Sequence, residues 1–425
     1  MLYYPVIQDI KFPDNQRKEE AQKRLELYHD IHELHTLNQL KDFSEPELLQ
    51  LASLNIVKKC INQLAQTYQE PPRRVVDGTD SDKEVFAQIV ESSMLDIKLK
   101  QASRYTKLLK TVLIRPVWRS NKMDLDILTP DFVDCEWGDT PSELLKVIVT
   151  NWGSLGRPDE VTFSIWTAET YVLKDYRGTV LESIPNPYKQ VPFIACWDYA
   201  PASDFWLPGG DDLISCQLAV NSKLVDLLHV LRHQAFGVGW IRGVAGSGHL
   251  RVDPGSLVEL PEDGALGFES QEAKITETIQ AIDQLLKWTA ITNGLPAASL
   301  STDPVEESGI SKQVSNSELE ELRRDDCELW RTYERQLFDI FRIVNNVHNT
   351  KKLSDKATLS IDFFDNKPVI SPTEQASAWE ALIALGVISQ VDIVMERNPD
   401  IATREDALAY LVELQQERKA ITNEV

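Results

Sequence analysis

The amino-acid sequence predicts an α+β protein in which helical segments flank a region of antiparallel strands. Apolar residues recur at helical spacing before residue 110 and again after residue 209. Between residues 111 and 197 they form short β-rich runs that turn signals separate. The chain has 425 residues, of which 42% are hydrophobic, so two or three domains and a large core are expected.

Three amphipathic helices are expected before the strands, over residues 15–40, 45–68 and 82–110. The second should stop at Pro71-Pro72, because proline lacks an amide hydrogen and clashes with the preceding turn. The third ends in a run of basic side chains without an acid. We interpret this run as a solvated helix face, and contact with nucleic acid or an acidic partner is the alternative. The run consists of Lys98, Lys100, Arg104, Lys107 and Lys110.

The central region is expected to form an antiparallel-rich sheet. Its strands are predicted at residues 112–114, 125–128, 145–150, 161–165, 171–174 and 193–196. One more alternating run, residues 357–363, predicts a late strand. Three short helices should then close the chain, at residues 374–385, 390–397 and 403–420, and Thr403 with Asp406 has the spacing of a capping box.

Residues 209–346 predict a helix, a glycine-containing excursion, a returning helix, an acidic loop and a long helix. The first helix, residues 211–234, has two apolar stripes, so it should touch neighbours on two sides. Burial inside one chain and packing between the hairpin partner and another subunit both fit. The stripes are Leu213, Val220, Leu224, Leu227 and Leu231, and Ile214, Leu218, Val225 and Leu228.

The returning helix, residues 272–292, has a single stripe at Ile275, Ile279, Ile282 and Leu286. The long helix, residues 311–346, changes character along its length. Residues 312–328 are strongly charged, whereas apolar residues recur from Leu329 onward. One end is therefore expected in solvent and the other in a core.

The balance of acidic and basic residues bears on whether the protein could bind nucleic acid tightly. Lys and Arg number 44 against 66 Asp and Glu, which gives a formal net charge of −22. This disfavours a protein that grips nucleic acid over most of its surface, but not one past which nucleic acid slides. The five cysteines have no metal or redox spacing, so free thiols in a reducing cytoplasm are expected. No signal peptide or membrane-spanning run is expected.

Searches for catalytic, metal and nucleotide motifs fail. A phosphate loop needs lysine after its last glycine, and the chain has no Gly-Lys pair. His29 and His32 lie close enough on a helix to share a metal, but His35 rotates away from them, so a solvated helix face is expected there instead. Carboxylates near Trp137 are expected at strand ends facing water, at Asp131, Asp134, Glu136 and Asp139. We therefore predict no enzyme, cofactor or metal.

The order of elements resembles the portal proteins of tailed double-stranded-DNA bacteriophages. Residues 54–68 followed by Pro71-Pro72 look like the early portal helix and extended segment, and residues 169–194 look like the strands that lead to a Pro-apolar strand. The resemblance implies a wing (1–208), two stem helices (209–236 and 270–292) around a clip (237–269), a tunnel loop (293–310), a long helix with a return strand of the wing (311–371) and a crown (372–425).

The resemblance implies a ring, usually a dodecamer, at one capsid vertex of the virion, assembled in the host cytoplasm. Double-stranded DNA would pass through it without sequence specificity during packaging and ejection. The expected partners are the terminase motor, tail or adaptor proteins and the major capsid protein, with no membrane.

The resemblance also assigns site residues. The tunnel loop and channel would contain Asp303, Glu306, Glu307, Ser308, Glu318, Glu320 and Glu321. The clip, where the motor or an adaptor docks, would contain Trp240, Arg242, His249 and Arg251. The stripe that would pack against another subunit is Leu213, Val220, Leu224, Leu227 and Leu231. For Glu318, Glu320 and Glu321 a merely solvated helix face is the alternative. The alternative function is a non-viral acidic oligomeric structural or adaptor protein, and an enzyme of unrecognised type comes third. A particle image showing a ring with an axial hole would separate them.

Overall fold

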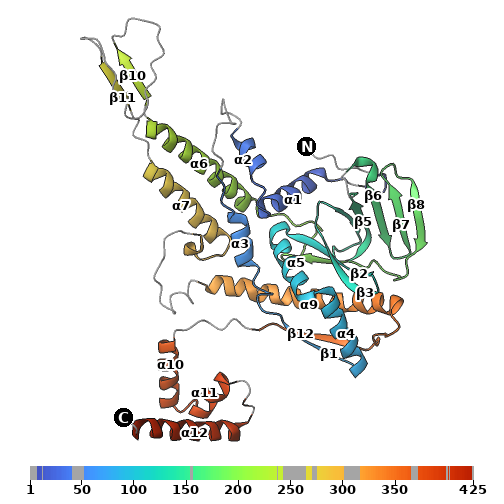
Figure 1. Ribbon diagram of the computed structural model, residues 1–425. Coiled ribbons are helices and arrows are strands. Elements are labelled where there is room, and N and C mark those ends of the chain that lie inside the picture. The colour runs from blue at the N-terminus through green and yellow to red at the C-terminus, as the bar shows by residue number, and fades with distance from the viewer. Residues whose placement is uncertain are drawn as a thin grey trace. The chain divides into compact units, whose positions relative to one another are not determined.

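The computed structural model describes residues 7–11, 13–40, 52–153, 157–236, 238–242, 265–269, 275–300, 316–364, 372–398, 401 and 403–423 (Figure 1). The chain divides into two compact units. The first comprises residues 1–305 and 316–364, and the second comprises residues 306–315 and 365–425. Helices combine with antiparallel sheets, which confirms the predicted α+β class.

The N-terminal helices are shorter and more numerous than expected. Residues 15–40 form two helices, α1 (Asn15–Tyr28) and α2 (Glu33–Gln39), rather than one. The chain turns at Asp30, whose φ of 68° lies in the left-handed region. The Asn55 amide donates to the carbonyls of Leu27, at 2.9 Å, and Tyr28, at 3.1 Å. A side chain far along the chain thus satisfies the end of α1, which local periodicity could not reveal.

The second and third expected helices are also corrected. The second is reduced to α3 (Ile56–Leu64), which begins after the capping side chain of Asn55, and residues 41–51 lie outside the described part. The third is two helices, α4 (Asp80–Ser93) and α5 (Leu95–Leu109). Met94, at φ 51°, ends α4 in a left-handed conformation, and the new direction allows Leu95 and Leu99 to be buried.

The strands form antiparallel sheets, as predicted. One has the order β4-β5-β6-β7-β8 and another the order β3-β2-β9. Strands β4 and β8 were not expected. The bounds are β2 (Thr111–Arg119), β3 (Lys122–Leu128), β4 (Val133–Trp137), β5 (Leu144–Asn151), β6 (Thr162–Thr167), β7 (Thr170–Asp175), β8 (Val180–Pro185) and β9 (Ile194–Trp197), with a short 3-10 turn, η2 (Pro158–Glu160), before β6.

The late strand is confirmed as β12 (Thr358–Asp362). It pairs antiparallel with β1 (Arg73–Asp77), with Val75 opposite Ser360. This pairing joins the segment after the second predicted helix to a segment almost three hundred residues later. Strand β1 itself has a short sequence with two arginines, so its assignment depends on the partner strand.

The main core gathers around the long helix α9 (Ser317–His348). Trp330, Tyr333, Leu337, Phe338 and Phe341 are buried there with residues of α4, β2 and β9. The expected burial of the apolar half is therefore confirmed, except at its end, where Val347 is exposed. Hydrophobic burial of this face fixes the helix against the sheet.

The second unit contains the three expected helices, α10 (Pro372–Ala384), α11 (Gln390–Arg397) and α12 (Arg404–Asn423). The Thr403 hydroxyl donates to the Asp406 carboxylate at 2.6 Å and accepts from the Asp406 amide at 3.2 Å, and the second of these bonds is one of the two that define the predicted capping box. A second capping box, Ser389 with Asp392, was not expected.

The five cysteines are free thiols, as predicted, and only Cys135 is not fully buried. Burial raises the pKa of the Cys60 thiol to about 12. No helix within the described ranges has the length and apolarity that crossing a membrane requires.

Candidate functional site

A helical hairpin with two strands at its far end is the first part of the candidate site (Figure 1). Helix α6 (Asp211–Phe236) runs antiparallel to α7 (Ile275–Thr292), and β10 (Val238–Arg242) pairs antiparallel with β11 (Ala265–Glu269) between them. The sequence favours strands at residues 238–242 and 249–252 in this excursion; β10 confirms the first, the second lies outside the described residues, and β11 was not expected. Trp240 and Arg242 lie on β10, whereas His249 and Arg251 lie outside the described residues.

The root of this hairpin is tied to the rest of the first unit by polar side chains. Asp212, at the start of α6, accepts from the hydroxyl of Thr292, the last residue of α7, at 3.3 Å and from the side-chain amide of the next residue, Asn293, at 2.9 Å. Arg24 donates to the carbonyl of Gly209 at 2.7 Å and pairs with Asp211. The start of α6 and the end of α7 are therefore held together.

Helix α6 also caps helix α3. The Gln217 side-chain oxygen accepts from the amides of Ile56, at 2.7 Å, and Val57, at 3.1 Å, and Asn221 accepts from the Leu54 amide at 3.0 Å. Both polar side chains are fully buried. These bonds satisfy amides that a helix start otherwise leaves without partners. Sequence reasoning missed this role, although both residues interrupt apolar stripes.

The apolar stripe assigned to subunit packing changes its environment along α6. Leu213 and Val220 are buried inside this chain, and Leu224 and Leu227 are half-buried. Leu231 is 41% exposed. Subunit packing stays a prediction, and in this chain the distal part of the stripe is the part that offers free apolar surface.

Helix α7 presents apolar surface that was not predicted. Ile282 and Leu286 of its expected stripe are buried, but Ile279 is exposed. Trp288 and Ile291 lie one turn apart and are 57% and 55% exposed. Exposed tryptophan in a helix with few charges is typical of a contact surface.

The loop after α7 and the start of α9 form the second part of the site. The loop begins with Gly294, at φ 71°, and a short 3-10 turn, η3 (Ala297–Ser299). A methyl group added at Gly294 would lie 2.6 Å from the Leu322 side chain of α9. The start of the loop therefore meets the first turns of the long helix.

The predicted channel residues fall into two groups. Glu318 and Glu321 are exposed on the first turns of α9, and Glu320 is half-exposed. Asp303, Glu306, Glu307 and Ser308 lie outside the described residues. Leu319 is buried beside them, so the helix start has one anchored face and one acidic, solvated face.

Buried charge networks fix α9 in place. Glu334 accepts from the Arg74 guanidinium, at 2.5 and 3.0 Å, and from the Tyr68 hydroxyl at 2.7 Å. Arg74 also pairs with Asp96 at 2.5 Å. Burial and the neighbouring Glu334 carboxylate raise the pKa of Tyr68 well above its usual value, so the hydroxyl stays a donor.

A second network corrects the prediction that the basic run is a solvated helix face. The Lys107 side chain is 13% exposed, and its ammonium lies 2.8 Å from carboxylate oxygens of both Asp198 and Asp326. Lys110 also pairs with Asp198 at 2.8 Å. Burial raises the pKa of Asp326 to about 6. The Lys107 ammonium opposes this rise only in part, because Asp198 also pairs with it. Burial also opposes ionisation of Asp198, but Lys107 and Lys110 hold its pKa below the usual value.

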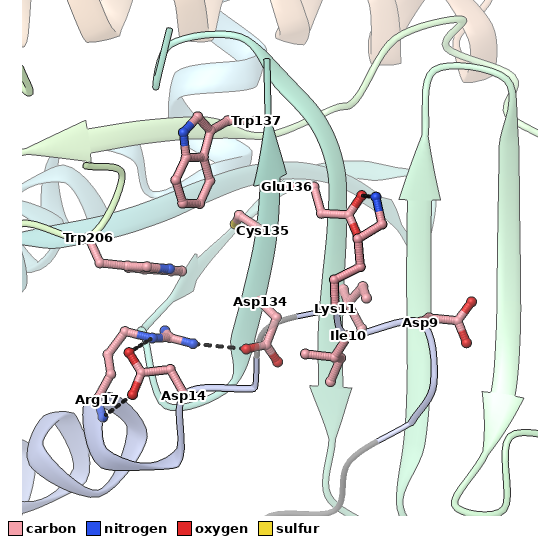
Figure 2. A pocket seen from close by; sticks show the side chains of 11 residues that line it. Asp9, Ile10, Lys11, Asp14, Arg17, Asp134, Cys135, Glu136, Trp137 and Trp206 are labelled. Atoms are coloured by element: carbon pink, nitrogen blue, oxygen red, sulfur yellow. Dashed lines mark hydrogen bonds and ion pairs between the residues drawn. The ribbon is translucent and has the colours of Figure 1, made fainter. Parts of the chain in front are cut away.

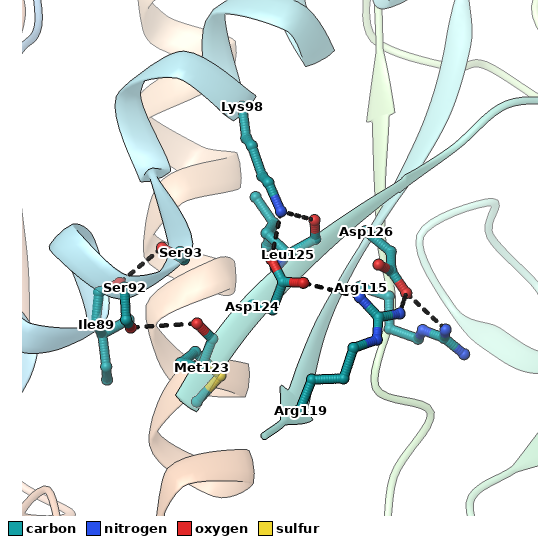
Figure 3. A network of polar contacts seen from close by, with 10 residues as sticks. All are labelled: Ile89, Ser92, Ser93, Lys98, Arg115, Arg119, Met123, Asp124, Leu125 and Asp126. Atoms are coloured by element: carbon teal, nitrogen blue, oxygen red, sulfur yellow. Dashed lines mark hydrogen bonds and ion pairs between the residues drawn. The ribbon is translucent and has the colours of Figure 1, made fainter. Parts of the chain in front are cut away.

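A third network binds α5 to the three-stranded sheet (Figure 3). Lys98, from the same basic run, pairs with Asp124. Arg119 pairs with Asp124 and Asp126 at 2.8 Å each, and Arg115 pairs with Asp126 at 2.7 Å. These basic side chains face acids of their own chain, so they are not an open basic patch for nucleic acid.

Two of the four carboxylates that were expected to face water, Asp134 and Glu136, instead line a cavity of about 200 Å³ (Figure 2). Asp134 is buried and pairs with Arg17 at 2.9 Å and Lys18 at 2.5 Å. The Arg17 guanidinium lies 4.0 Å from the ring centre of Trp206. Burial raises the pKa of Asp131, whereas Asp139 is exposed as expected. The Asp134 carboxylate that lines this cavity is therefore neutralised by basic side chains of the same chain.

The histidine prediction also needs correction. His32 is buried, and burial lowers the pKa of its imidazole. His35 contacts Glu26 at 2.7 Å and His29 contacts the Tyr105 hydroxyl at 3.1 Å. In the described part of the chain, no three His, Cys, Asp or Glu side chains form a group that could hold a metal ion.

Comparisons with known proteins give structural matches alone. No protein-family model matches the chain, and no curated protein matches its sequence. Similar solved structures include the neck of an empty gene transfer agent particle computed with C6 symmetry, at 10% identity and a TM-score of 0.48, over 80% of this chain and 89% of that chain. The neck of a native particle computed with C12 symmetry is 13% identical with a TM-score of 0.45, over 79% and 88%. A chain of the native particle's virion is 11% identical with a TM-score of 0.44, over 79% and 88%.

Proposed function

We propose that this chain is the portal protein of a tailed phage or phage-like particle and forms a ring that conducts DNA at one capsid vertex. One observation supports the proposal: helix α6, strand β10, helix α7, the loop, helix α9 and strand β12 follow one another in the order that the sequence predicts. In this reading α6 and α7 are the stem, β10 and β11 belong to the clip, and α10–α12 belong to the crown.

The charge distribution supports a conduit rather than a DNA-gripping protein. The chain has a net charge of −22, and Glu318 and Glu321 are exposed where α9 begins. B-DNA carries a negative charge about every 1.7 Å, so a basic wall would hold it through counterion release. An acidic wall repels it and allows it to slide. Screening over about 8 Å leaves this role to carboxylates near the DNA.

The proposed partners follow from this role. The terminase motor and, later, tail or adaptor proteins would dock at the β10–β11 side, where Trp240 and Arg242 lie. The wing would meet the major capsid protein. The ring would hydrolyse no nucleotide and use no cofactor, because the motor supplies that chemistry. Its place would be the virion, after assembly in the host cytoplasm.

The first experiment is native mass spectrometry and cryo-imaging of the purified full chain. We expect closed rings with an axial hole, roughly ten to thirteen copies and most often twelve, because a head-to-tail contact that closes makes a ring. A stable monomer at high concentration, together with the absence of a ring in particles, would refute the proposal. A compact oligomer without a hole would favour the acidic structural or adaptor protein.

The second experiment tests the acidic wall. Replacing Glu318 and Glu321 with Lys should create salt-sensitive binding of duplex DNA to rings that do not bind it at physiological salt. The matched control replaces the exposed Glu169 and Glu182 with Lys, which makes the same charge change on the β-sheet. Equal binding by both variants would show that only net charge matters. Tight binding by the wild-type ring would remove the sliding role.

The third experiment concerns the loop. Lys at Glu306 and Glu307 should slow packaging in vitro, and deletion of residues 299–308 should leave rings intact but impair packaging or DNA retention. The loop contains glycine, proline and small polar residues, which are typical of surface segments. A deletion that prevents ring assembly would show that the loop has a structural role instead.

A further inference from the structure

A groove of about 480 Å³ lies where helix α4, the turn between β2 and β3, and the end of helix α9 meet. Its volume falls within the range of about 300–1,000 Å³ that is usual for ligand pockets. The apolar side chains that line it, Val85, Ile89 and Met123, are buried, so they form its floor. None of the described residues assigned above to the channel, the clip or subunit packing lines this groove.

Hydrogen bonds between distant segments hold the walls of the groove in place. The Ser92 hydroxyl of α4 donates to the Met123 carbonyl of β3 at 3.2 Å (Figure 3). The backbone amide of Ser354, which follows α9, donates to the carboxylate of Asp82, near the start of α4, at 2.7 Å. The groove is thus formed without a ligand, and a ligand that enters it need not pay for ordering its walls.

The polar groups at the rim indicate which chemistry the groove would bind. Gln88 and Asn121 are exposed, and neither side chain forms a hydrogen bond with another residue that the structure describes. Each side-chain amide offers donors and an acceptor together, which matches the alternating N–H and C=O groups of an extended peptide. The charged residues that line the groove, Glu91 and Lys122, are of opposite sign. The lining therefore favours an uncharged peptide segment that places an apolar side chain on the floor.

Two other ligand classes fit the groove less well. Nucleic acid requires several basic groups to neutralise its phosphates, whereas Lys122 is the one basic residue among the described lining residues. A sugar ring stacks on an open aromatic face. The aromatic side chain that lines the groove is Trp118, and the ring of His348 stacks on it with ring centres 5.9 Å apart and planes 10° apart. The surface on which a sugar would stack is therefore partly occupied.

The position of the groove along α9 indicates the source of the peptide. Asn345, which lines the groove, lies about 40 Å along the helix axis from Glu318, at about 1.5 Å per residue. In the proposed ring the Glu318 end of α9 faces the channel, so the groove lies at the end that is remote from the DNA. That end faces the shell that surrounds the ring.

We propose that this groove holds an extended, uncharged segment of the major capsid protein. The side-chain amides of Gln88 and Asn121 bond to its main chain, and one of its apolar side chains lies on the floor formed by Val85, Ile89 and Met123. The inference rests on the proposed function. It adds the surface and the kind of segment by which the shell holds the ring.

Photo-cross-linking in assembled particles that contain the full-length chain tests the occupant. Benzoylphenylalanine replaces Lys122, which is exposed and lines the groove, and in a control chain it replaces Lys59, which is exposed on α3 and does not line it. We expect illumination to join the Lys122 variant to one contiguous, uncharged segment of the major capsid protein, identified by mass spectrometry. The control should not reach that segment.

Binding of a synthetic peptide with the sequence of that segment to purified rings tests the two amides. The double variant Gln88→Ala, Asn121→Gly should bind it roughly tenfold more weakly, because two hydrogen bonds are lost. Glycine suits position 121, where φ is 59°. The matched control, Asn38→Ala with Gln39→Ala, removes two exposed amides of α2 and should bind the peptide as the wild type does.

Each other outcome overturns a stated part of the proposal. Cross-links from the Lys122 position to a second copy of this chain would make the groove an interface between copies. Cross-links to a different particle protein, or none in particles that contain rings, would remove the major capsid protein as the occupant. A peptide that does not bind, or that binds the double variant equally well, would overturn the amide contacts. Particles without rings would overturn the proposed function itself, so the two failures are distinguishable.

Discussion

The long helix α9 and the C-terminal helix α12 differ in how far their apolar side chains are covered by the rest of the chain. The apolar half of α9 is covered by its own chain, and even Glu334 on that helix is buried with Arg74 and Tyr68 as partners. On α12, Leu408 is 52% exposed. The apolar half of α9 is therefore stabilised by contacts within one chain, whereas the large apolar side chains of α12 that the structure describes are mostly exposed. The predictions below test that contrast.

The largest effect is expected at the buried network of α9. Glu334→Ala should lower the free energy of unfolding of the first unit by about 3–5 kcal/mol, because it leaves the buried Arg74 charge without its main partner. Denaturant unfolding measures this. The matched control is Glu328→Ala on the same helix, whose side chain is 74% exposed and pairs with Arg331. This control should change stability by less than about 0.5 kcal/mol. Equal losses of stability in the two variants would show that the buried Glu334 pair contributes no more than the exposed Glu328 pair.

A pH-dependent effect is expected at Asp326. Its pKa is raised from the usual 3.8 to about 6, so the folded chain keeps a proton that the unfolded chain releases between these values. The associated stability is present below about pH 4 and is lost as the pH rises through 6. Two pKa units correspond to about 3 kcal/mol. Asp326→Asn should remove this dependence, so its stability relative to wild type should rise across the window.

The measurement for Asp326 is denaturant unfolding at several pH values between about 4 and 8. Lys107 keeps Asp198 as a partner in the variant, so the network is not left with an unpaired ammonium. A stability difference between variant and wild type that does not change with pH would contradict the shifted pKa.

A smaller effect is expected where the loop meets α9. Gly294→Ala should cost about 1–3 kcal/mol, because the residue is left-handed and the new methyl meets Leu322 at 2.6 Å. Gly178→Ala is the matched control, since Gly178 is also left-handed, at φ 83°, but has open space around it. It should cost about 1 kcal/mol from the backbone alone. Thermal or denaturant unfolding compares them, and equal costs would show that Leu322 moves aside.

The smallest effect on folding is expected at Trp288. It is compared with a buried residue of the same helix, Ile282. Trp288→Ala should change the free energy of unfolding of the unassembled chain by less than about 0.5 kcal/mol, because the side chain is 57% exposed. Rings should nevertheless form less readily, as native mass spectrometry over a dilution series would show. Ile282→Ala on the same helix, which removes a buried residue, should instead destabilise the chain. A large folding loss at Trp288 would assign it to the core.

The sequence by itself determined the α+β class, the α6–α7 hairpin, the long helix, the late strand and the three C-terminal helices. These elements rest on local periodicity and on local signals such as Thr403 with Asp406, which need no distant partner. The acidic start of α9 was also visible, because the charge of Glu318 and Glu321 is a property of composition.

Only the tertiary structure decided the breaks at Asp30 and Met94, the pairing of β1 with β12 and the burial of Lys107. Three of these features depend on groups far along the chain: the Asn55 amide satisfies the end of α1, the strand that begins at Thr358 completes β1, and Asp198 and Asp326 neutralise Lys107. From the sequence, a lysine in a charged run is predicted to face solvent, because the sequence does not show which carboxylates fold beside it. Exposure at Trp288 and Leu408 is likewise set by which neighbours three-dimensional packing supplies, and periodicity does not contain that information.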